Sequence, residues 1–414
     1  MTNSPFKKSQ IFCTRCVYPA NHPLRITFDA QGVCSGCRVH EEKAALDWSE
    51  RFAKLKAITA GYRNASGGNY DCVVPVSGGR DSYFIVETVV KKLGLRPLLV
   101  TYNKHYNTPR GIRNLAYLRT IFGVDLMTQT ISPETVKKIT RATLKKNGSM
   151  YWHCLAGQTV FPVQVAVRFK IPLIIWGAHQ GLDQVGMFSH TDEVEMTRKY
   201  RKDHDLMGYE AEDLVDEGGL TGGDLQAFMY PHDKELEKVG VRGIYLGNYI
   251  PWDTKKQHEE MIQKYGYESA QLSRTFDSYN DVDCFNYSDV HDYIKYIKHG
   301  YGKASDHAAR EIRWGRLTRE EGIALIERYE HVPPKNLPLF LEWLGMGEAE
   351  FMKEIGRHKN PKRSDDSVGN HTDDPGVDTV RLPKKEGCTF VLTPSKKPTE
   401  DKDAYILIGK GYSN

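Results

Sequence analysis

Residues 71–82 read Asp71-Cys72-Val73-Val74-Pro75-Val76-Ser77-Gly78-Gly79-Arg80-Asp81-Ser82, and this stretch decides the predicted fold. The apolar run that ends at Val76 predicts a strand buried on both faces, as in a parallel sheet. After the glycine pair, Val86, Val90 and Leu93 follow at a helical spacing, and Gly94 supplies a helix stop. The stretch therefore predicts a tight turn between a core strand and a helix N-terminus.

Such a turn is suited to bind an anion, because backbone N–H groups converge there and the helix dipole favours negative charge. Glycine lets the backbone approach phosphate oxygens closely. Ser77 and Ser82 can donate hydroxyl hydrogen bonds, whereas Asp81 would hold Mg²⁺ or tie the loop down. A glycine pair by itself could also be only a tight turn. The sequence contains no Walker A pattern.

The whole string from 77 to 82 resembles the SGGxDS loop of the PP-loop ATP pyrophosphatases, with Arg80 at the variable position. The resemblance implies that ATP is cleaved between its α and β phosphates and that AMP is placed on a substrate oxygen. It implies Ser77 and Asp81 as catalytic residues. The implied ATP and pyrophosphate contacts in the loop are Ser77, Gly78, Gly79, Arg80, Asp81 and Ser82. Tyr102 and Gly177 are added as ATP contacts because each follows a predicted strand, and ligands of such sheets bind at the carboxyl ends of the strands.

Composition indicates a globular protein of two or three domains: 414 residues, 40% hydrophobic and 27% charged. The net charge of +4 is too small to predict a nucleic-acid partner. We find neither a signal-peptide core near the start nor a run of 18 apolar residues, so we expect no membrane span. The sequence has eight cysteines but no secretion signal, so we expect the protein in the reducing cytoplasm. There we expect the cysteines to take part in metal or thiol chemistry rather than in disulfides.

Two C-x-x-C knuckles lie near the N-terminus, and 17 residues separate them. This spacing predicts one structural Zn²⁺ with four thiolate ligands, Cys13, Cys16, Cys34 and Cys37. Disulfides or unpaired thiols are the alternative. Residues 32–36 also fit the G-x-C-x-G pattern of a glutaminase nucleophile elbow. We discount the elbow because a turn precedes it and Cys34 is assigned to zinc.

Strands alternate with helices after residue 70, which predicts an α/β fold with a doubly wound parallel sheet. We expect strands at 71–76, 97–101, 124–130, 171–176 and 241–246, and a charged linking helix at 41–60. Residues 185–240 form a polar insertion, either a solvated excursion, which we favour, or a lid or partner surface. The predicted domains are a zinc-knuckle module with its linker (1–63), an ATP-binding domain (70–254), a helical substrate-binding region (255–357) and a polar tail (358–414).

The helical region carries a dense arginine segment, with Arg310, Arg313, Arg316 and Arg319 spaced three apart. Arginine binds phosphate in a bidentate manner, so the segment suits a polyanionic substrate such as a nucleotide sugar. The predicted substrate residues are Lys298, Asp306, Arg310, Arg313 and Arg316. The alternative is that these arginines form salt bridges to Glu311, Glu320 and Glu321.

The sequence resembles the N-acetyl sugar amidotransferases of the WbpG and PseA types. The resemblance is carried by the zinc knuckles, residues 77–82, Trp252-Asp253 and the segment from Lys298 through Arg319. The resemblance covers residues 10–355. It implies a PP-loop fold of the adenine nucleotide alpha hydrolase type and a role in bacterial surface polysaccharide synthesis, such as that of lipopolysaccharide O-antigen. It also implies ATP and Mg²⁺ as cofactors and a separate HisH-type glutaminase subunit that supplies ammonia.

The implied chemistry converts an acetamido group to an acetamidino group. AMP is transferred to the acetamido oxygen, and ammonia then displaces AMP from the resulting imidate. A PP-loop tRNA thiolase is the main alternative, but thiolases need a cysteine pair near the site, and Cys154 and Cys284 lie 130 positions apart. A non-catalytic zinc-ribbon adaptor is a weaker alternative, since an adaptor has no need of a complete phosphate loop.

Overall fold

The structure, a computed structural model, describes residues 11–24 and 26–359. At its centre five parallel strands form one sheet in the order β3-β2-β1-β4-β5. Their bounds are β1 Cys72–Pro75, β2 Pro97–Tyr102, β3 Asp125–Gln129, β4 Leu173–Trp176 and β5 Arg242–Tyr245. The predicted α/β class and all five predicted strands are therefore confirmed.

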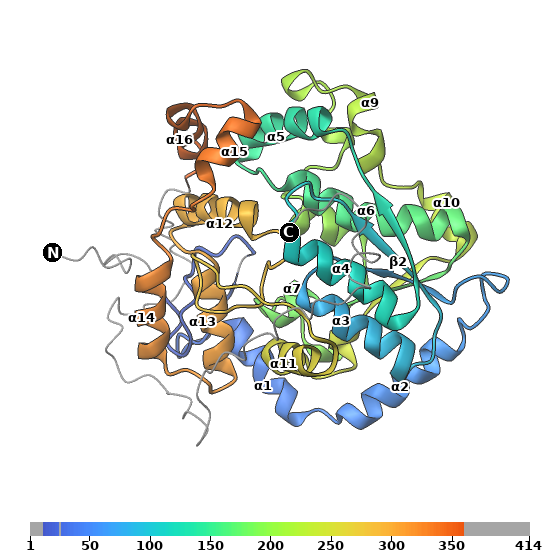
Figure 1. Cartoon of the computed structure of the whole chain (residues 1–414). Helices are drawn as coiled ribbons and strands as arrows, with labels where there is room; N and C mark the ends of the chain where they lie inside the picture. The colour runs from blue at the N-terminus through green and yellow to red at the C-terminus, as the bar shows by residue number, and fades with distance from the viewer. Residues whose placement is uncertain (1–10, 25, 360–414) are drawn as a thin grey trace.

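Helices cover both faces of the sheet (Figure 1). Helix α6 (Trp152–Phe169) packs on one face, where Val73 and Ile174 point. Helices α2 (Trp48–Ala60), α3 (Arg80–Glu87), α4 (Pro109–Phe122) and α11 (Thr254–Tyr265) pack on the other, against Val74 and Leu99. Because neighbouring side chains of a strand point to opposite faces, continuous apolar strands fill both layers.

Capping residues set the ends of two core helices. Thr108 accepts a hydrogen bond from the Gly111 N–H at the start of α4, and Gly123 ends the helix at φ 60°. The helix after the phosphate loop runs as α3 to Glu87, continues through a π-helical turn at Thr88–Lys92, and stops before Gly94 at φ +62°.

The remaining helices follow the chain order. Their bounds are α1 Ser35–Ala45, α5 Pro133–Asn147, α7 Gln180–Asp183, α8 Arg198–Tyr200, α9 Gly222–Leu225, α10 Asp233–Val239, α12 Phe285–His299, α13 Lys303–Arg313, α14 Arg319–Tyr329, α15 Leu337–Leu344 and α16 Glu348–Gly356. Short 3-10 and π turns connect several of them. The prediction that residues 255–355 are mainly helical is confirmed, and no helix among the described residues is long and apolar enough to cross a membrane.

The single linking helix predicted at 41–60 is wrong. Two helices occupy this segment, and α1 already begins at Ser35, directly after a knuckle cysteine. The break falls at Asp47, whose side chain accepts hydrogen bonds from the N–H groups of Ser49 and Glu50 and so caps α2. Aspartate at an N-cap competes with helix continuation, and this explains the break.

The N-terminal knuckles and the C-terminal helices share one apolar cluster. Val17 and Tyr18 of the knuckle segment pack with Ala308 and Ile312 of α13 and Ile326 of α14. Figure 1 shows the blue N-terminal segment beside α13 and α14, although nearly 300 positions separate them in the chain. The two regions therefore pack as one body.

The polar insertion, residues 185–240, is not the solvated excursion that we favour from its sequence. Leu206, Leu214, Leu225 and Phe228 are fully buried and pack against Trp152 of α6. Short turns bring these sparse apolar residues to one side, and no regular periodicity reveals them. Residues 360–414, which include most of the predicted polar tail, lie outside the described residues.

Candidate functional site

The phosphate loop, residues 77–82, connects the carboxyl end of β1 to the first turn of α3. Its two hydroxyl groups shape it: Ser82 Oγ accepts a hydrogen bond from the Ser77 N–H (2.9 Å), and Ser77 Oγ accepts one from the Gly79 N–H (3.0 Å). The Asp81 side chain is 37% exposed and lies 3.4 Å from the Arg80 guanidinium. The loop thus presents a helix N-terminus and one accessible carboxylate at the edge where ligands of such sheets bind.

Glycine is required in this loop for a steric reason. A Cβ atom built on Gly78 would lie 2.2 Å from the carbonyl oxygen of Gly111 in α4, and the backbone offers no flexible neighbour that could move away. Gly111 in turn faces Asp283, whose Cα would lie 2.4 Å from a Cβ at Gly111. Three backbone segments therefore meet at the phosphate loop.

The third of these segments is a strap, residues 267–284, which connects α11 to α12 without regular structure. Asp283 of the strap forms a buried ion pair with Lys104 (2.8 Å), two residues beyond the end of β2. Burial alone would lower the pKa of Lys104, but the Asp283 carboxylate holds that pKa above its ordinary value. Sequence reasoning missed Lys104, although its place just after a parallel strand could have indicated it.

The strap also supplies partners for Arg80. The Arg80 guanidinium lies 5.6 Å from the ring centre of Tyr279, and the Arg310 guanidinium lies 5.5 Å from the same ring. His258 of α11 stacks on Tyr279 at 4.3 Å between ring centres. The base of the loop is therefore an aromatic and cationic cluster built by the C-terminal region.

Two predicted ATP contacts outside the loop take part in the packing of the protein. The Tyr102 side chain is 4% exposed, and its hydroxyl pairs with His153 Nδ1 (3.0 Å), so the structure argues against a direct contact with ATP. Gly177 follows β4, and a Cβ there would lie 2.9 Å from Ile85 of α3 and 3.1 Å from Trp252. Close packing of β4 against α3 explains this glycine.

Each guanidinium group of the arginine segment donates to a partner within the protein. Arg310 donates to Asp277 (3.1 Å) and Glu311 (2.8 Å), and Arg316 donates to both carboxylate oxygens of Asp253 (3.0 Å each). Arg316 also pairs with Glu311.

The other two arginines hold the knuckle segment. Arg313 donates to the carbonyl of Gln184 (2.7 Å) and lies 3.6 Å from Cys34 Sγ, and Arg319 donates to the carbonyl of Cys16 (3.0 Å). The pairs with Glu311 are those of the salt-bridge alternative. The structure therefore argues against Arg310, Arg313 and Arg316 as open substrate contacts, because each of these guanidinium groups already donates to groups within the protein.

The other two predicted substrate residues lie at a cavity. Lys298 lines it and donates to the carbonyls of Asn147 (2.8 Å) and Gly148 (3.4 Å) at the end of α5. Asp306 does not line it but pairs with Lys295 (2.6 Å), which does. Asp306 thus orients a basic residue of the cavity wall.

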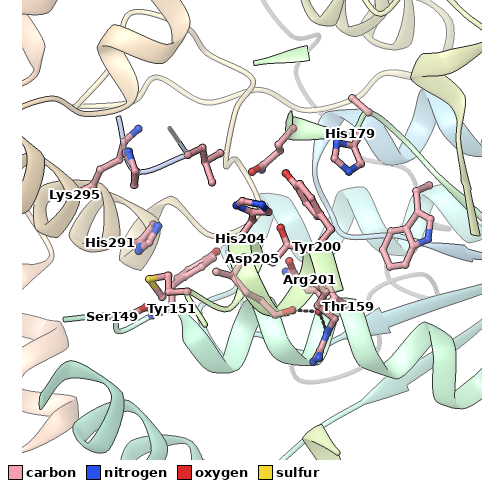
Figure 2. Close-up of a pocket in the computed structure, with 18 of the residues that line it drawn as sticks. Ser149, Tyr151, Thr159, His179, Tyr200, Arg201, His204, Asp205, His291 and Lys295 are labelled. Atoms are coloured by element: carbon pink, nitrogen blue, oxygen red, sulfur yellow. Dashed lines mark hydrogen bonds between the residues drawn. The ribbon is translucent and has the colours of Figure 1, made fainter. Parts of the chain in front are cut away.

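The cavity has a volume of about 500 Å³ and lies beyond the carboxyl ends of β4 and β5. Six separate segments form its wall: the knuckle segment at 23–24, residues 148–159 of α6 and its preceding loop, the end of β4, the insertion at 196–207, Tyr245 at the end of β5, and α12. In Figure 2, Lys295 and His291 of α12 lie on one side, and Tyr200, Asp205 and His179 lie on the other. The volume is within the usual range for small-molecule sites.

Burial sets the protonation of the cavity groups. It raises the pKa of the Asp205 carboxyl to about 7 and lowers the pKa of Lys298 to about 8. Burial also lowers the pKa values of His179 and His299 to about 4, so both imidazoles are neutral at pH 7. Among the described residues, neither nitrogen of His179 has a hydrogen-bond partner, although its side chain is only 2% exposed.

The four predicted zinc ligands come together. The sulfur atoms of Cys13, Cys16, Cys34 and Cys37 lie within 4.8 Å of one another, and all four residues are buried. The backbone N–H groups of Cys16 (3.4 Å) and Cys34 (3.2 Å) point at Cys13 Sγ, a favourable arrangement for a thiolate. The cluster could hold a metal ion such as zinc, and four soft sulfur ligands fit that ion well. In the described segments 11–24 and 26–33, no strand of the core sheet precedes Cys34, in agreement with the discounted elbow.

Cys154 and Cys284 are far apart in sequence but share one buried apolar cluster. Cys284 Sγ lies 3.2 Å from the Tyr151 hydroxyl and 3.4 Å from Lys104 Nζ. Burial raises the pKa of the Cys284 thiol to about 12 and that of Cys154 well above its usual range. Both are protonated at neutral pH and are poor nucleophiles, as expected for core thiols.

Comparison with known proteins gives a match for the C-terminal region. Residues 259–367 match a family described as "LPS biosynthesis protein WbpG-like, C-terminal domain". The resemblance to the WbpG-like family is therefore confirmed for this region. The WbpG-like region includes the strap and α12, so it contributes both the cover of the phosphate loop and one wall of the cavity.

Two further likenesses were found. The uncharacterized protein MJ1599 of Methanocaldococcus jannaschii is 26% identical over 118 residues, which are 28% of this chain and 41% of that protein. The structure of the NMN synthetase of Francisella tularensis is similar over 53% of this chain and 96% of that chain, with 13% identity and a TM-score of 0.27. At these values neither likeness informs on activity.

Proposed function

We propose that the chain is the synthetase subunit of an ATP-dependent amidotransferase that converts the acetamido group of a nucleotide-activated sugar to an acetamidino group in bacterial surface polysaccharide synthesis. The observation that carries the proposal is the phosphate loop. It sits at the carboxyl end of the central strand β1 and is covered by a strap from the WbpG-like region. Nucleotide chemistry and the family-specific region thus meet at one place.

In the proposed first step, the acetamido oxygen attacks the α-phosphorus of ATP, and pyrophosphate leaves with its bridging oxygen. The α3 N-terminus and the amides of the phosphate loop would stabilise the departing pyrophosphate, since they favour negative charge. Asp81, the accessible carboxylate of the loop, would hold Mg²⁺, which neutralises phosphate charge. Ser77 and Ser82 keep the loop in shape through their backbone hydrogen bonds.

In the second step, ammonia adds to the imidate carbon. The bond between this carbon and the AMP oxygen then breaks, so AMP leaves with the former acetamido oxygen and the amidine keeps the new nitrogen. The acetamidino product carries a positive charge at neutral pH after it takes up the extra proton of ammonia. We propose that a separate HisH-type glutaminase subunit supplies the ammonia, and that the four-cysteine cluster binds one structural Zn²⁺.

The test is product analysis by chromatography with a panel of acetamido nucleotide sugars. We expect AMP and pyrophosphate with high ammonium, and no product with glutamine alone in the absence of the partner. Asp81→Ala should remove metal-dependent activity, because the pyrophosphate would lose its counter-charge. Formation of ADP would contradict the proposal, and AMP formation that requires tRNA and a sulfur donor would favour a thiolase.

A further inference from the structure

The cavity beyond β4 and β5 has two chemically different ends. Its α12 end carries Lys295, Lys298, His291 and His299. Its insertion end carries Asp205 and also Arg201, whose charge is already paired with Glu210. Among the described lining residues, Asp205 is the single carboxylate. A basic end and an acidic end in one cavity indicate a ligand with an anionic part and a second part that donates hydrogen bonds or carries positive charge.

Ring nitrogens at both ends lack partners among the described residues. They are both nitrogens of His179 and the Nδ1 atoms of His291 and His299. A buried ring nitrogen without a partner is unfavourable, and a bound polar ligand would satisfy it. Stacking on Tyr151, with ring centres 4.7 Å apart, fixes the plane of His291, so this ring is positioned before any ligand arrives.

The basic end is also held in place. Lys295 is oriented by Asp306 (2.6 Å), and Lys298 by the carbonyl of Asn147 (2.8 Å). Side chains restrained in this way lose little further freedom when they bind an anion. Both lysines lie on α12, within the residues that match the WbpG-like family, so this end belongs to the family-specific part of the chain rather than to the nucleotide loop.

We propose that this cavity is the acceptor site, and that it binds an acetamido sugar carried on a nucleoside diphosphate, with the diphosphate at the Lys295–Lys298 end and the acetamido group near Asp205. This inference rests on the proposed function for the identity of the acceptor. The reaction turns a neutral acetamido group into a cation, and a nearby carboxylate stabilises that developing charge. Asp205 then stabilises the transition state of the reaction, whereas Lys295 and Lys298 bind the diphosphate of the substrate.

This division gives two different expected effects. In calorimetric titration with the panel of acetamido nucleotide sugars, Lys298→Gln should weaken binding of the best member at least tenfold. Asp205→Asn should change that affinity less than threefold but lower the rate of AMP formation at saturating sugar at least tenfold. Neither variant should change the affinity for α,β-methylene-ATP, a non-cleavable probe of the phosphate loop, more than twofold.

The controls address folding and the nature of the anion. Lys238→Gln, on the exposed face of α10, should leave the affinities for the nucleotide sugar and for α,β-methylene-ATP unchanged. Because Lys298 also tethers α12 to α5, thermal unfolding is measured for each variant, and His291→Gln provides a second test of the basic end if Lys298→Gln does not fold. Free N-acetyl sugars should bind at least tenfold more weakly than their nucleotide forms.

Several results would overturn the inference. The first is that Lys298→Gln and His291→Gln fold and keep the wild-type affinity for the nucleotide sugar, and the second is that these variants lose affinity equally for the nucleotide sugar and for α,β-methylene-ATP. The third is that free sugars bind as tightly as nucleotide sugars, and the fourth is that no panel member binds. If wild-type protein makes AMP from a panel member while the cavity variants behave as wild type, only the acceptor site is wrong. If no panel member yields AMP, the proposed function fails instead.

Discussion

The phosphate loop and the cavity differ in how the chain builds them. The loop consists of six consecutive residues whose serines bond to the loop's own backbone, so its geometry is local. The cavity is assembled from six segments that span residues 23 to 299. The proposed nucleotide chemistry thus depends on one short string of sequence, whereas the candidate acceptor site exists only after the knuckles, the sheet and α12 have packed together.

Breaking the local region should have the largest effect. Gly78→Ala should reduce AMP formation at least about 100-fold, comparable to the loss of an electrostatic donor at an active site, because the new methyl group would meet the Gly111 carbonyl and displace the loop. Gly347→Ala is the matched control, since a Cβ there meets nothing within 4 Å. Normal activity of Gly78→Ala would disprove the role of this close approach.

Breaking the cysteine cluster should damage the assembled region next. Wild-type protein should contain about one zinc per chain, because one ion takes four ligands. Cys34→Ser should remove this metal and lower the free energy of unfolding by about 4 kcal/mol or more. Because the knuckle segment contributes to the cavity wall, sugar-nucleotide binding should be lost as well. Metal analysis and chemical unfolding test this. The control is Cys72→Ala, which changes a buried core cysteine outside the cluster; this variant should retain the metal of the four-cysteine cluster.

Acid should also weaken the assembled region. The pKa values of His179 and His299 are lowered to about 4 by burial, whereas the unfolded chain binds protons near pH 6.5. Between these values the unfolded state binds more protons, so stability falls as pH falls, by up to about 1.4 kcal/mol per pH unit for each such group. Urea unfolding from pH 7.5 to 5 measures the slope, and His179→Gln should reduce it. An unchanged slope in this variant would contradict the burial of a neutral imidazole.

The arginine segment gives the smallest expected effect and separates its two interpretations. Arg316→Ala breaks the paired contact with Asp253 and should lower stability by about 2 kcal/mol, with sugar-nucleotide affinity within twofold of wild type. Arg357→Ala, which removes an exposed pair with Glu354, should cost less than about 0.5 kcal/mol. A tenfold loss of sugar-nucleotide affinity in Arg316→Ala without loss of stability would restore the prediction made from sequence.

Much of the fold could be predicted because its signals are local. Apolar runs between turn residues give the five strands, Thr108 and Gly123 give the ends of α4, and the cysteine spacing gives the cluster. The break at Asp47 was also local, but a charged, helix-favouring sequence on both sides hid it.

The partners of charged residues could not be predicted, because they come from distant segments. Arg316 pairs with Asp253, 63 positions away, and Lys104 pairs with Asp283, 179 positions away. Four arginines spaced three apart therefore suggested an open anion site, although each guanidinium donates to a partner within the protein. The cavity residue Asp205 gave no signal, since its raised pKa arises only from burial in the folded chain.

Attack of the acetamido oxygen on the α-phosphorus of ATP would leave an isotope signature in both products. The best nucleotide sugar of the panel is prepared with ¹⁸O in its acetamido group and incubated with ATP, Mg²⁺ and ammonium, and the nucleotide product is analysed by mass spectrometry. The account predicts AMP that carries one ¹⁸O atom and an acetamidino sugar that carries none. Unlabelled AMP, or ADP as the product, would contradict it.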